Sequence, residues 1–145
     1  MIRKATTDDF VQVAVLMTEL WPDNTVEEML EELYSADEAA GAFFLAEEAG
    51  EAIGFAQCQL RHDYVEGTEH SPVGYLEGVF VREPHRGNGV AKALLCACEK
   101  WAVEQGCTEF ASDCELDNGG SLAFHLAAGF TEANRIICFT KKLNR

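Results

Sequence analysis

The feature that most constrains the fold of this 145-residue chain is a strand-like run that passes through a glycine-marked turn into an amphipathic helix. Residues 75–81 are rich in β-branched and aromatic side chains, and Pro84 closes the run in a turn. A helix is expected to start near Gly89 and to end near Gln105, because apolar residues recur there at helical spacing. Glycines at its entrance leave backbone N–H groups unobstructed, and a helix N-terminus carries partial positive charge. The junction therefore predicts a cradle for a pyrophosphate.

Hydrophobic periodicity over the whole chain predicts the element order β-α-α-β-β-β-α-β-α-β-β, without repeats or linkers. Strands are expected at 2–5, 42–48, 52–62, 73–82 and 108–113, and a final hairpin through Phe130 and 136–139. Helices are expected from a Thr7 cap to Trp21, from a Thr25 capping box to about Tyr34, from Gly89 to about Gln105, and from Asn118 to Ala128. Such alternation predicts an α/β fold with a mixed central sheet flanked by helices. A chain of this length is expected to form one domain, residues 1–145.

The charge of the chain limits its partners. The formal net charge is −14, and residues 5–60 contain neither Lys nor Arg. Nucleic acid is not expected as a partner, because phosphate contacts need a basic surface. An acidic field instead favours a cationic small substrate, although acidity can also serve solubility alone.

Cysteine usage and hydropathy indicate the compartment. Six cysteines occur without a C-x-x-C pair, which predicts reduced, mostly structural thiols in a cytoplasmic protein. No apolar run reaches the length of a membrane span, and the polar residues that follow Lys4 predict no signal peptide. The histidines at 62, 70 and 85 have no metal-ligand spacing, so no metal is expected.

Two levels of resemblance follow from these motifs. Arg86-x-x-Gly89-x-Ala91 matches the R/Q-x-x-G-x-G/A signature of the GCN5-related N-acetyltransferases (GNAT), whose element order is also the one predicted here. An ordinary strand–turn–helix junction is the alternative for this signature alone. Residues 63–79, 107–113, 117–118 and 129–130 further resemble bacterial aminoglycoside 6'-N-acetyltransferases of the chromosomal type. This resemblance implies acetyl-CoA as co-substrate, an aminoglycoside 6'-amine as acceptor and a homodimer, although such a chain can also have drifted to another amine.

The resemblance also implies which residues bind the cofactor. They are the backbone of one strand end, the turn with the start of the long helix, and one amide: Val79, Phe80, Val81, Arg86, Gly87, Asn88, Gly89, Val90, Ala91, Lys92 and Asn118. Asn118 also fits a plain helix N-cap.

Two carboxylates are candidates for the acceptor side. Glu77 lies inside a strand, where a charge is costly unless it faces a cleft or a partner, and the resemblance places a substrate-binding carboxylate there. Asp113 ends a strand and matches the position that binds the reacting amine and acts as general base. Such a group is needed because a primary ammonium, with a pKa near ~10, cannot attack a thioester while it is protonated. Strand-end acids such as Asp113 can also cap helices or shape loops.

Further positions follow from the same resemblance. Trp21 and Tyr64 match residues that line the sugar-binding cleft, where flat rings cover aminoglycoside rings. Glu66 and Glu69 either hold additional ammonium groups or belong to a solvated loop. Asn134 stands near a position where the family often has a glutamate that reaches the cleft of the partner subunit.

His125 stands where many acetyltransferases have a tyrosine that protonates the departing CoA thiolate. Its imidazole could donate that proton, pack against the cofactor or serve only the helix. The sequence thus predicts an acetyl-CoA-dependent N-acetyltransferase of aminoglycosides that acts by direct attack in a ternary complex. The alternatives are acetylation of polyamines, diamines or peptide amines, and a non-catalytic acyl-CoA sensor. Glu77 with Asp113 argues against a sensor, and Trp21 with Tyr64 favours a ring-bearing acceptor.

Overall fold

The computed structural model describes residues 1–144. The elements in chain order are β1 (Ile2–Lys4), the 3-10 helix η1 (Thr7–Asp9), α1 (Phe10–Leu20), α2 (Val26–Ser35), β2 (Gly41–Glu48), β3 (Glu51–Arg61), β4 (Val73–Val81), the 3-10 helix η2 (Glu83–His85), α3 (Val90–Glu104), β5 (Phe110–Ser112) and α4 (Gly119–Ala127). The chain divides into two compact units, Met1–Asp113 and the residues from Cys114 onward, and each is described by itself. This is the mixed α/β architecture that the sequence predicted.

The five strands of the first unit form one sheet in the order β1-β2-β3-β4-β5. The first three pairs are antiparallel, and β4 pairs with β5 in parallel. A parallel pair needs a long crossover connection, and η2 with α3 provides it. The strand–turn–helix junction found in the sequence is therefore the crossover between β4 and β5.

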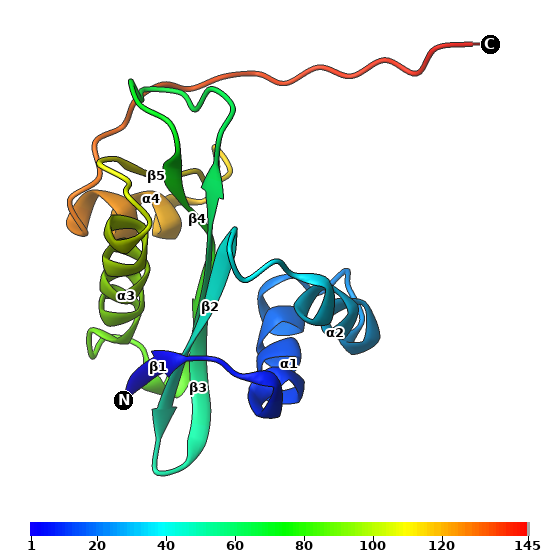
Figure 1. The fold of residues 1–145 in the computed structure, drawn as a ribbon, viewed down its shortest axis with the longest axis vertical. Coiled ribbons are helices and arrows are strands. Elements are labelled where there is room, and N and C mark those ends of the chain that lie inside the picture. Colours follow the sequence, from blue (N-terminus) through cyan, green and yellow to red (C-terminus); the bar gives the residue numbers. More distant parts are fainter. Residues whose placement is uncertain (145) are drawn as a thin grey trace. The chain divides into compact units, whose positions relative to one another are not determined.

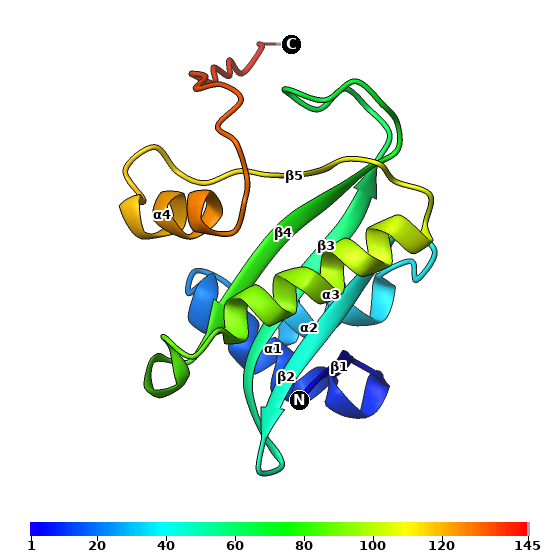
Figure 2. The ribbon, with the colours of Figure 1, turned by 90° about the vertical axis from the view of Figure 1, so that its left-hand side faces the viewer.

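Helices cover both faces of this sheet. Figure 1 views the sheet nearly edge-on, with α3 on one face and α1 and α2 on the other, and Figure 2 shows α3 in front of the strands. Buried residues of α3 recur at helical spacing, and they are Leu94, Leu95, Cys98, Trp101 and Ala102. The alternation of strands β2 to β4 supplies an apolar surface to each helical layer.

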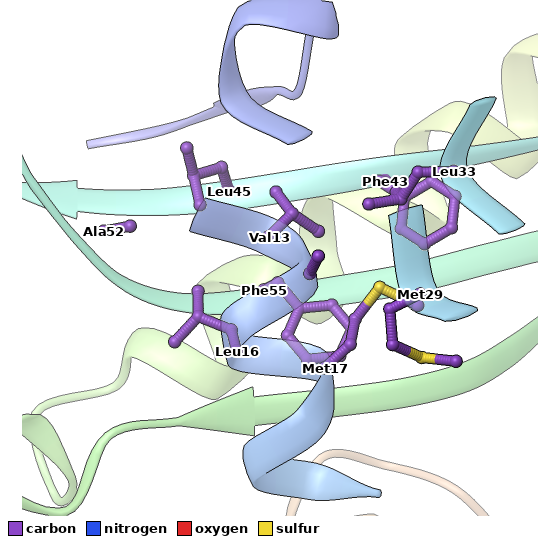
Figure 3. Packing of buried hydrophobic residues seen from close by; sticks show 10 residues of the cluster. Val13, Leu16, Met17, Met29, Leu33, Phe43, Leu45, Ala52 and Phe55 are labelled. Atoms are coloured by element: carbon purple, nitrogen blue, oxygen red, sulfur yellow. The ribbon is translucent and has the colours of Figure 1, made fainter. Parts of the chain in front are cut away.

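The core on the other face is formed by α1, α2 and the central strands (Figure 3). The side chains of Val13, Leu16 and Met17 on α1 are fully buried, and they pack in one cluster with Phe55 of β3. Burying side chains of this size is worth roughly 1.5–3 kcal/mol each relative to exposure. The cluster therefore fixes α1, and with it Trp21 at the end of α1, against the sheet.

Helix starts follow the sequence closely, with one shift. The Thr25 capping box is confirmed, because the Thr25 hydroxyl accepts from the Glu28 backbone N–H while the Glu28 carboxylate accepts from the Thr25 N–H. The expected cap at Thr7 is wrong by one residue. Thr6 is the N-cap of η1, and the Asp9 carboxylate accepts from the Thr6 N–H and hydroxyl. Asp9 occupies the N3 position of this capping box, three residues after Thr6, which places the cap at Thr6 and not at Thr7.

The expected final hairpin is absent from the described part of the second unit, where residues 130–144 form neither a strand nor a helix. The side chains of Ile136, Ile137 and Phe139 are 68%, 81% and 88% exposed. A β-branched and aromatic run has the local preference for a strand, but a strand also needs a neighbour for its hydrogen bonds. Within residues 1–144, no helix is both long and apolar enough to cross a membrane.

Candidate active site

A β-bulge in β4 sets the position of Glu77. In the β3–β4 ladder Gln57 is opposite Gly78 and Cys58 is opposite Leu76, so Glu77 is an extra residue without a partner in the register. Bulges of this kind re-aim a side chain and bend the strand. Trp21 lies directly on the bulge, because a Cβ on Gly78 would come within 2.6 Å of the Trp21 ring. Glycine at 78 therefore allows the indole to reach the strand beside Glu77.

The Glu77 carboxylate is held by two side chains of the neighbouring strand. Arg61 donates to both carboxylate oxygens, with its Nη2 3.0 Å from each, and Gln59 donates from Nε2 to Oε2 at 2.6 Å. Because strand side chains alternate, Gln59 and Arg61 share the sheet face of Glu77. The cost of placing a carboxylate inside a strand is thus offset by a charged partner and an amide.

Asp113 is held by a different residue, Tyr75. The Tyr75 hydroxyl donates to Asp113 Oδ2 at 2.6 Å. Tyr75 is 6% exposed, and burial together with the bond to Asp113 raises the pKa of its phenol well above its ordinary value. The phenol therefore stays protonated, as a donor must. The Arg61 guanidinium lies 3.5 Å from the centre of the Tyr75 ring, within range of a cation–π contact.

A surface pocket of about 270 Å³ opens beside the bulge and is lined by Trp21, Asn24, Met29, Glu32, Gln57, Gln59 and Glu77. Two carboxylates, three amides and one indole make it suitable for a cationic, hydroxyl-rich ring. A larger hollow of about 370 Å³ lies between α1 and the β2–β3 turn, where Glu51 is its one carboxylate and Arg82 opposes it. The smaller pocket is therefore the better candidate for a cationic ligand.

The loop between β3 and β4 holds the other residues expected at a sugar site. Tyr64 is 76% exposed and does not line the pocket, and Glu66 and Glu69 are also exposed. The loop is fixed by Glu109, which accepts from the Glu69 and His70 backbone N–H groups. The structure brings Trp21 and Glu77 together and leaves Tyr64 apart from them.

The start of α3 has the geometry of an anion cradle. Gly87 and Gly89 have φ angles of +82° and +79°, which favour glycine, and a Cβ at either position would meet no atom within 4 Å. The first backbone N–H groups of a helix lack partners within it. The backbone N–H groups of this turn are therefore open to a ligand, and pyrophosphate binding there stays a prediction. The Arg86 guanidinium donates to the Val81 carbonyl oxygen at 2.7 Å and so ties the turn to the end of β4.

One edge of β4 is open beside this cradle. The parallel strand β5 pairs with Gly74, Tyr75 and Leu76 only, so within residues 1–144 the edge from Glu77 to Val81 has no strand on that side. Unpaired backbone N–H and C=O groups at a strand edge can bind an extended amide-bearing chain. The open edge contains Val79, Phe80 and Val81, which were expected to contact the cofactor.

Three expected site residues lie in the second unit. The Asn118 side chain accepts from the Ser121 N–H at 3.1 Å, so it caps α4. His125 Nδ1 lies 2.7 Å from the Ser121 carbonyl oxygen. Nδ1 is the donor of this hydrogen bond, because a carbonyl oxygen can only accept. Asn134 lies in the exposed terminal segment and accepts from the Arg135 N–H. The roles of these three residues toward the first unit remain predictions.

Sequence reasoning missed several residues of this site, among them Glu32, Gln59, Arg61 and Tyr75. The polar alternation of Gln57, Gln59 and Arg61 in β3 was a usable signal, because polar side chains at every second position form one face. In residues 1–144 no group of three or more His, Cys, Asp or Glu residues could hold a metal ion.

Comparison with known proteins adds to this geometry. The family described as "Acetyltransferase (GNAT) family" matches residues 3–130. The chain is 47% identical over 144 residues to an aminoglycoside N(6')-acetyltransferase type 1 of Stenotrophomonas maltophilia, covering 98% of this chain and 93% of that protein. It also resembles the apo crystal structure of the 6'-N-acetyltransferase AAC(6')-IG from Acinetobacter haemolyticus, with TM-score 0.92, 37% identity and 99% of both chains covered. AAC(6')-Iy in complex with the bisubstrate analogue CoA-S-monomethyl-acetylneamine has TM-score 0.91 and 39% identity, covering 99% of this chain and 98% of the other.

Proposed function

This chain belongs to the GNAT family of acetyltransferases, and from that premise we infer that it is an aminoglycoside 6'-N-acetyltransferase that uses acetyl-CoA. The observation that carries this function is the pocket beside the β4 bulge, where Trp21, Glu32 and Glu77 come together. Aminoglycosides are polycationic sugars, so carboxylates and a flat aromatic face suit them. The same activity is named for relatives that match nearly the whole chain.

The cofactor residues fit acetyl-CoA at two places. The Gly87–Lys92 turn offers backbone N–H groups and the α3 N-terminus to a pyrophosphate, and the open β4 edge from Glu77 to Val81 offers backbone partners to an amide-bearing arm. When bound, acetyl-CoA supplies the acetyl group as a thioester. Asn118 caps α4 through its side-chain oxygen, which leaves the amide NH₂ group as its contribution to the cofactor.

On the acceptor side we assign different roles to the two carboxylates. Glu77 already accepts from Arg61 and Gln59, so its charge is compensated and it orients the acceptor. Asp113 accepts from the neutral phenol of Tyr75, so this hydrogen bond does not neutralise the negative charge of the carboxylate. Asp113 therefore binds the reacting ammonium and accepts its proton, which frees the amine for attack. We keep His125 as the candidate donor to the departing thiolate.

The functional unit proposed here is a homodimer of single catalytic domains in the cytoplasm. The GNAT match extends from the first compact unit into the second, as far as residue 130, which supports one domain over residues 1–145. The exposed apolar segment around Ile136, Ile137 and Phe139 is favourable to bury in a second copy, and Asn134 beside it would then face the partner. All six cysteines are free, three of them exposed, which suits a reducing compartment.

A thiol-release assay with acetyl-CoA tests the function. Neamine, spermidine and a peptide with a free N-terminal amine are offered as acceptors at equal concentration. We expect kcat/KM for neamine to exceed the other two by at least about 100-fold, because only neamine uses both the ring-binding face and the carboxylates. A preference for spermidine or the peptide would replace the proposed substrate class.

A further inference from the structure

Tyr75 lies between the two carboxylates of the acceptor side, Glu77 and Asp113. Neither its residue type nor its position in the sequence indicated a role in the site. Its hydroxyl contacts Asp113, and its ring lies under the guanidinium of Arg61, which binds Glu77. The Tyr75 side chain thus links Arg61 of β3 and its partner Glu77 of β4 to Asp113 at the end of β5. The connections are consistent with strand geometry, because Tyr75 and Glu77 are two residues apart in β4 and Tyr75 is opposite Ala111 of β5.

The conformation of the Asp113 side chain has to be fixed by a residue outside β5. It follows directly after β5, a strand of three residues, and it is exposed. The β4–β5 ladder ends at the Leu76–Ser112 pair, so the backbone of Asp113 lies outside that ladder. A carboxylate in this setting can adopt several rotamers unless a side chain fixes it.

Tyr75 can fix the Asp113 carboxylate because its own side chain is buried. Its side chain packs with Val65, Val73 and Ala111 in a small buried cluster. The raised pKa of the phenol keeps its proton in place through neutral and moderately alkaline pH. A rigid donor at 2.6 Å from Oδ2 restricts the carboxylate and leaves Oδ1 available to an ammonium.

We propose that Tyr75 is a positioning residue for acetyl transfer, whose hydroxyl orients Asp113 toward the acceptor amine while its ring supports the Arg61–Glu77 pair. The proposal rests on the proposed function, because Asp113 is taken as the group that receives the proton of the amine. A hydrogen bond to a charged group is typically worth a change of about 10- to 100-fold in a rate or equilibrium constant. Such a factor is what the Tyr75 hydroxyl is expected to contribute to kcat/KM.

The test is Tyr75→Phe, which removes the hydroxyl and keeps the ring under Arg61. Kinetics with neamine and acetyl-CoA should show kcat/KM for neamine lower by about 10-fold or more, with the KM for acetyl-CoA within about twofold of wild type. Tyr34→Phe is the matched control, because it removes the same hydroxyl from an exposed residue of α2. Urea titrations establish that the variants are folded under assay conditions.

A double-mutant cycle separates positioning from a structural role. If Tyr75 acts through Asp113, Tyr75→Phe should cost less than about twofold in an Asp113→Ala background, where residue 113 no longer accepts the Tyr75 hydrogen bond, as measured by product formation over long incubations. Equal losses in both backgrounds would overturn the proposal, and so would unchanged kinetics in Tyr75→Phe or a parallel loss of acetyl-CoA binding. Wild-type enzyme that fails to acetylate neamine would instead refute the proposed function.

Discussion

At the scale of single residues, Asp113 is the proposed proton acceptor, and Asp113→Asn is an informative substitution because Asn keeps the shape of the side chain. In Asp113→Asn the amide oxygen can still accept from the Tyr75 hydroxyl, so positioning is largely kept while the negative charge is lost. We expect kcat/KM for an aminoglycoside to fall by ~10²–10⁴-fold at neutral pH, with little change in acetyl-CoA binding. Steady-state kinetics from pH 6 to about 9.5 measure the effect.

The pH dependence distinguishes two causes of that loss. Raising the pH supplies free amine, so the activity of Asp113→Asn should recover in part if a base is missing. A loss that is equal at every pH would mean that the charge of Asp113 binds the ammonium group without accepting its proton. Asp8→Asn, which removes the same charge from an exposed residue of η1, serves as control. Near-normal turnover in Asp113→Asn would move the proton acceptor to Glu77 or to water.

Asp9 provides a pH-dependent contribution to stability. It is 6% exposed and accepts two hydrogen bonds from Arg3 at 2.7 Å, and this pair lowers the pKa of Asp9 well below its usual range. The ionised carboxylate therefore stabilises the fold fully above the unfolded pKa of about 3.9, and the contribution fades as the pH falls below that value.

Asp9→Asn should accordingly lower the free energy of unfolding at pH 7, and the deficit should shrink between about pH 4 and pH 2. Urea denaturation at a series of pH values measures this difference. The neighbouring variant Asp8→Asn removes an exposed carboxylate and is expected to show no such trend. A deficit that is constant with pH would contradict an ionic role for Asp9.

At the scale of elements, a substitution at the start of α3 tests the proposed cofactor site. Gly89→Val places a β-branched side chain at φ +79° and fills the open space over the turn. We expect the KM for acetyl-CoA to rise by about tenfold or more, since 1.4 kcal/mol of lost binding corresponds to one factor of ten.

Gly106→Val is the matched control at the other end of the same helix. Gly106 has φ +92° and equally open surroundings, so the substitution introduces comparable strain far from the turn. Both variants should lose stability, and only Gly89→Val should weaken acetyl-CoA binding. Equal effects of the two variants on that KM would mean that strain, not the cradle, accounts for the change.

The elements also show how far the sequence predicts this structure. Apolar patterning located α3 and strands β2 to β4 within one or two residues, because α3 buries one continuous face and the strands bury side chains on both faces of the sheet. The Arg61–Glu77 pair could not be predicted, because it depends on the register of β3 against β4 and on the bulge at Glu77. The hairpin expected at 136–139 failed for the opposite reason, since local preference was present and a neighbouring strand was not.

At the scale of the whole molecule, the exposed apolar segment at residues 136–143 indicates that two copies of the chain associate. Four large apolar side chains between residues 136 and 143 are exposed, at Ile136, Ile137, Phe139 and Leu143. We expect sedimentation at micromolar concentration to give twice the 16.0 kDa mass of one chain. Phe139→Asp should shift the equilibrium toward monomer while leaving the far-UV circular dichroism unchanged, because a buried charge is costly in an interface. A wild-type monomer at that concentration would refute the homodimer.

The most direct test of 6'-acetylation compares two acceptors that differ in a single substituent. Neamine has an amine at the 6' position, and paromamine is the same molecule with a hydroxyl there. Thiol release from acetyl-CoA should be rapid with neamine and at least about 100-fold slower with paromamine, because a hydroxyl cannot present an ammonium to Asp113. Nuclear magnetic resonance of the neamine product should locate the acetyl group on the 6' nitrogen. Comparable turnover of the two acceptors, or acetylation of neamine at another amine, would contradict the assigned reaction.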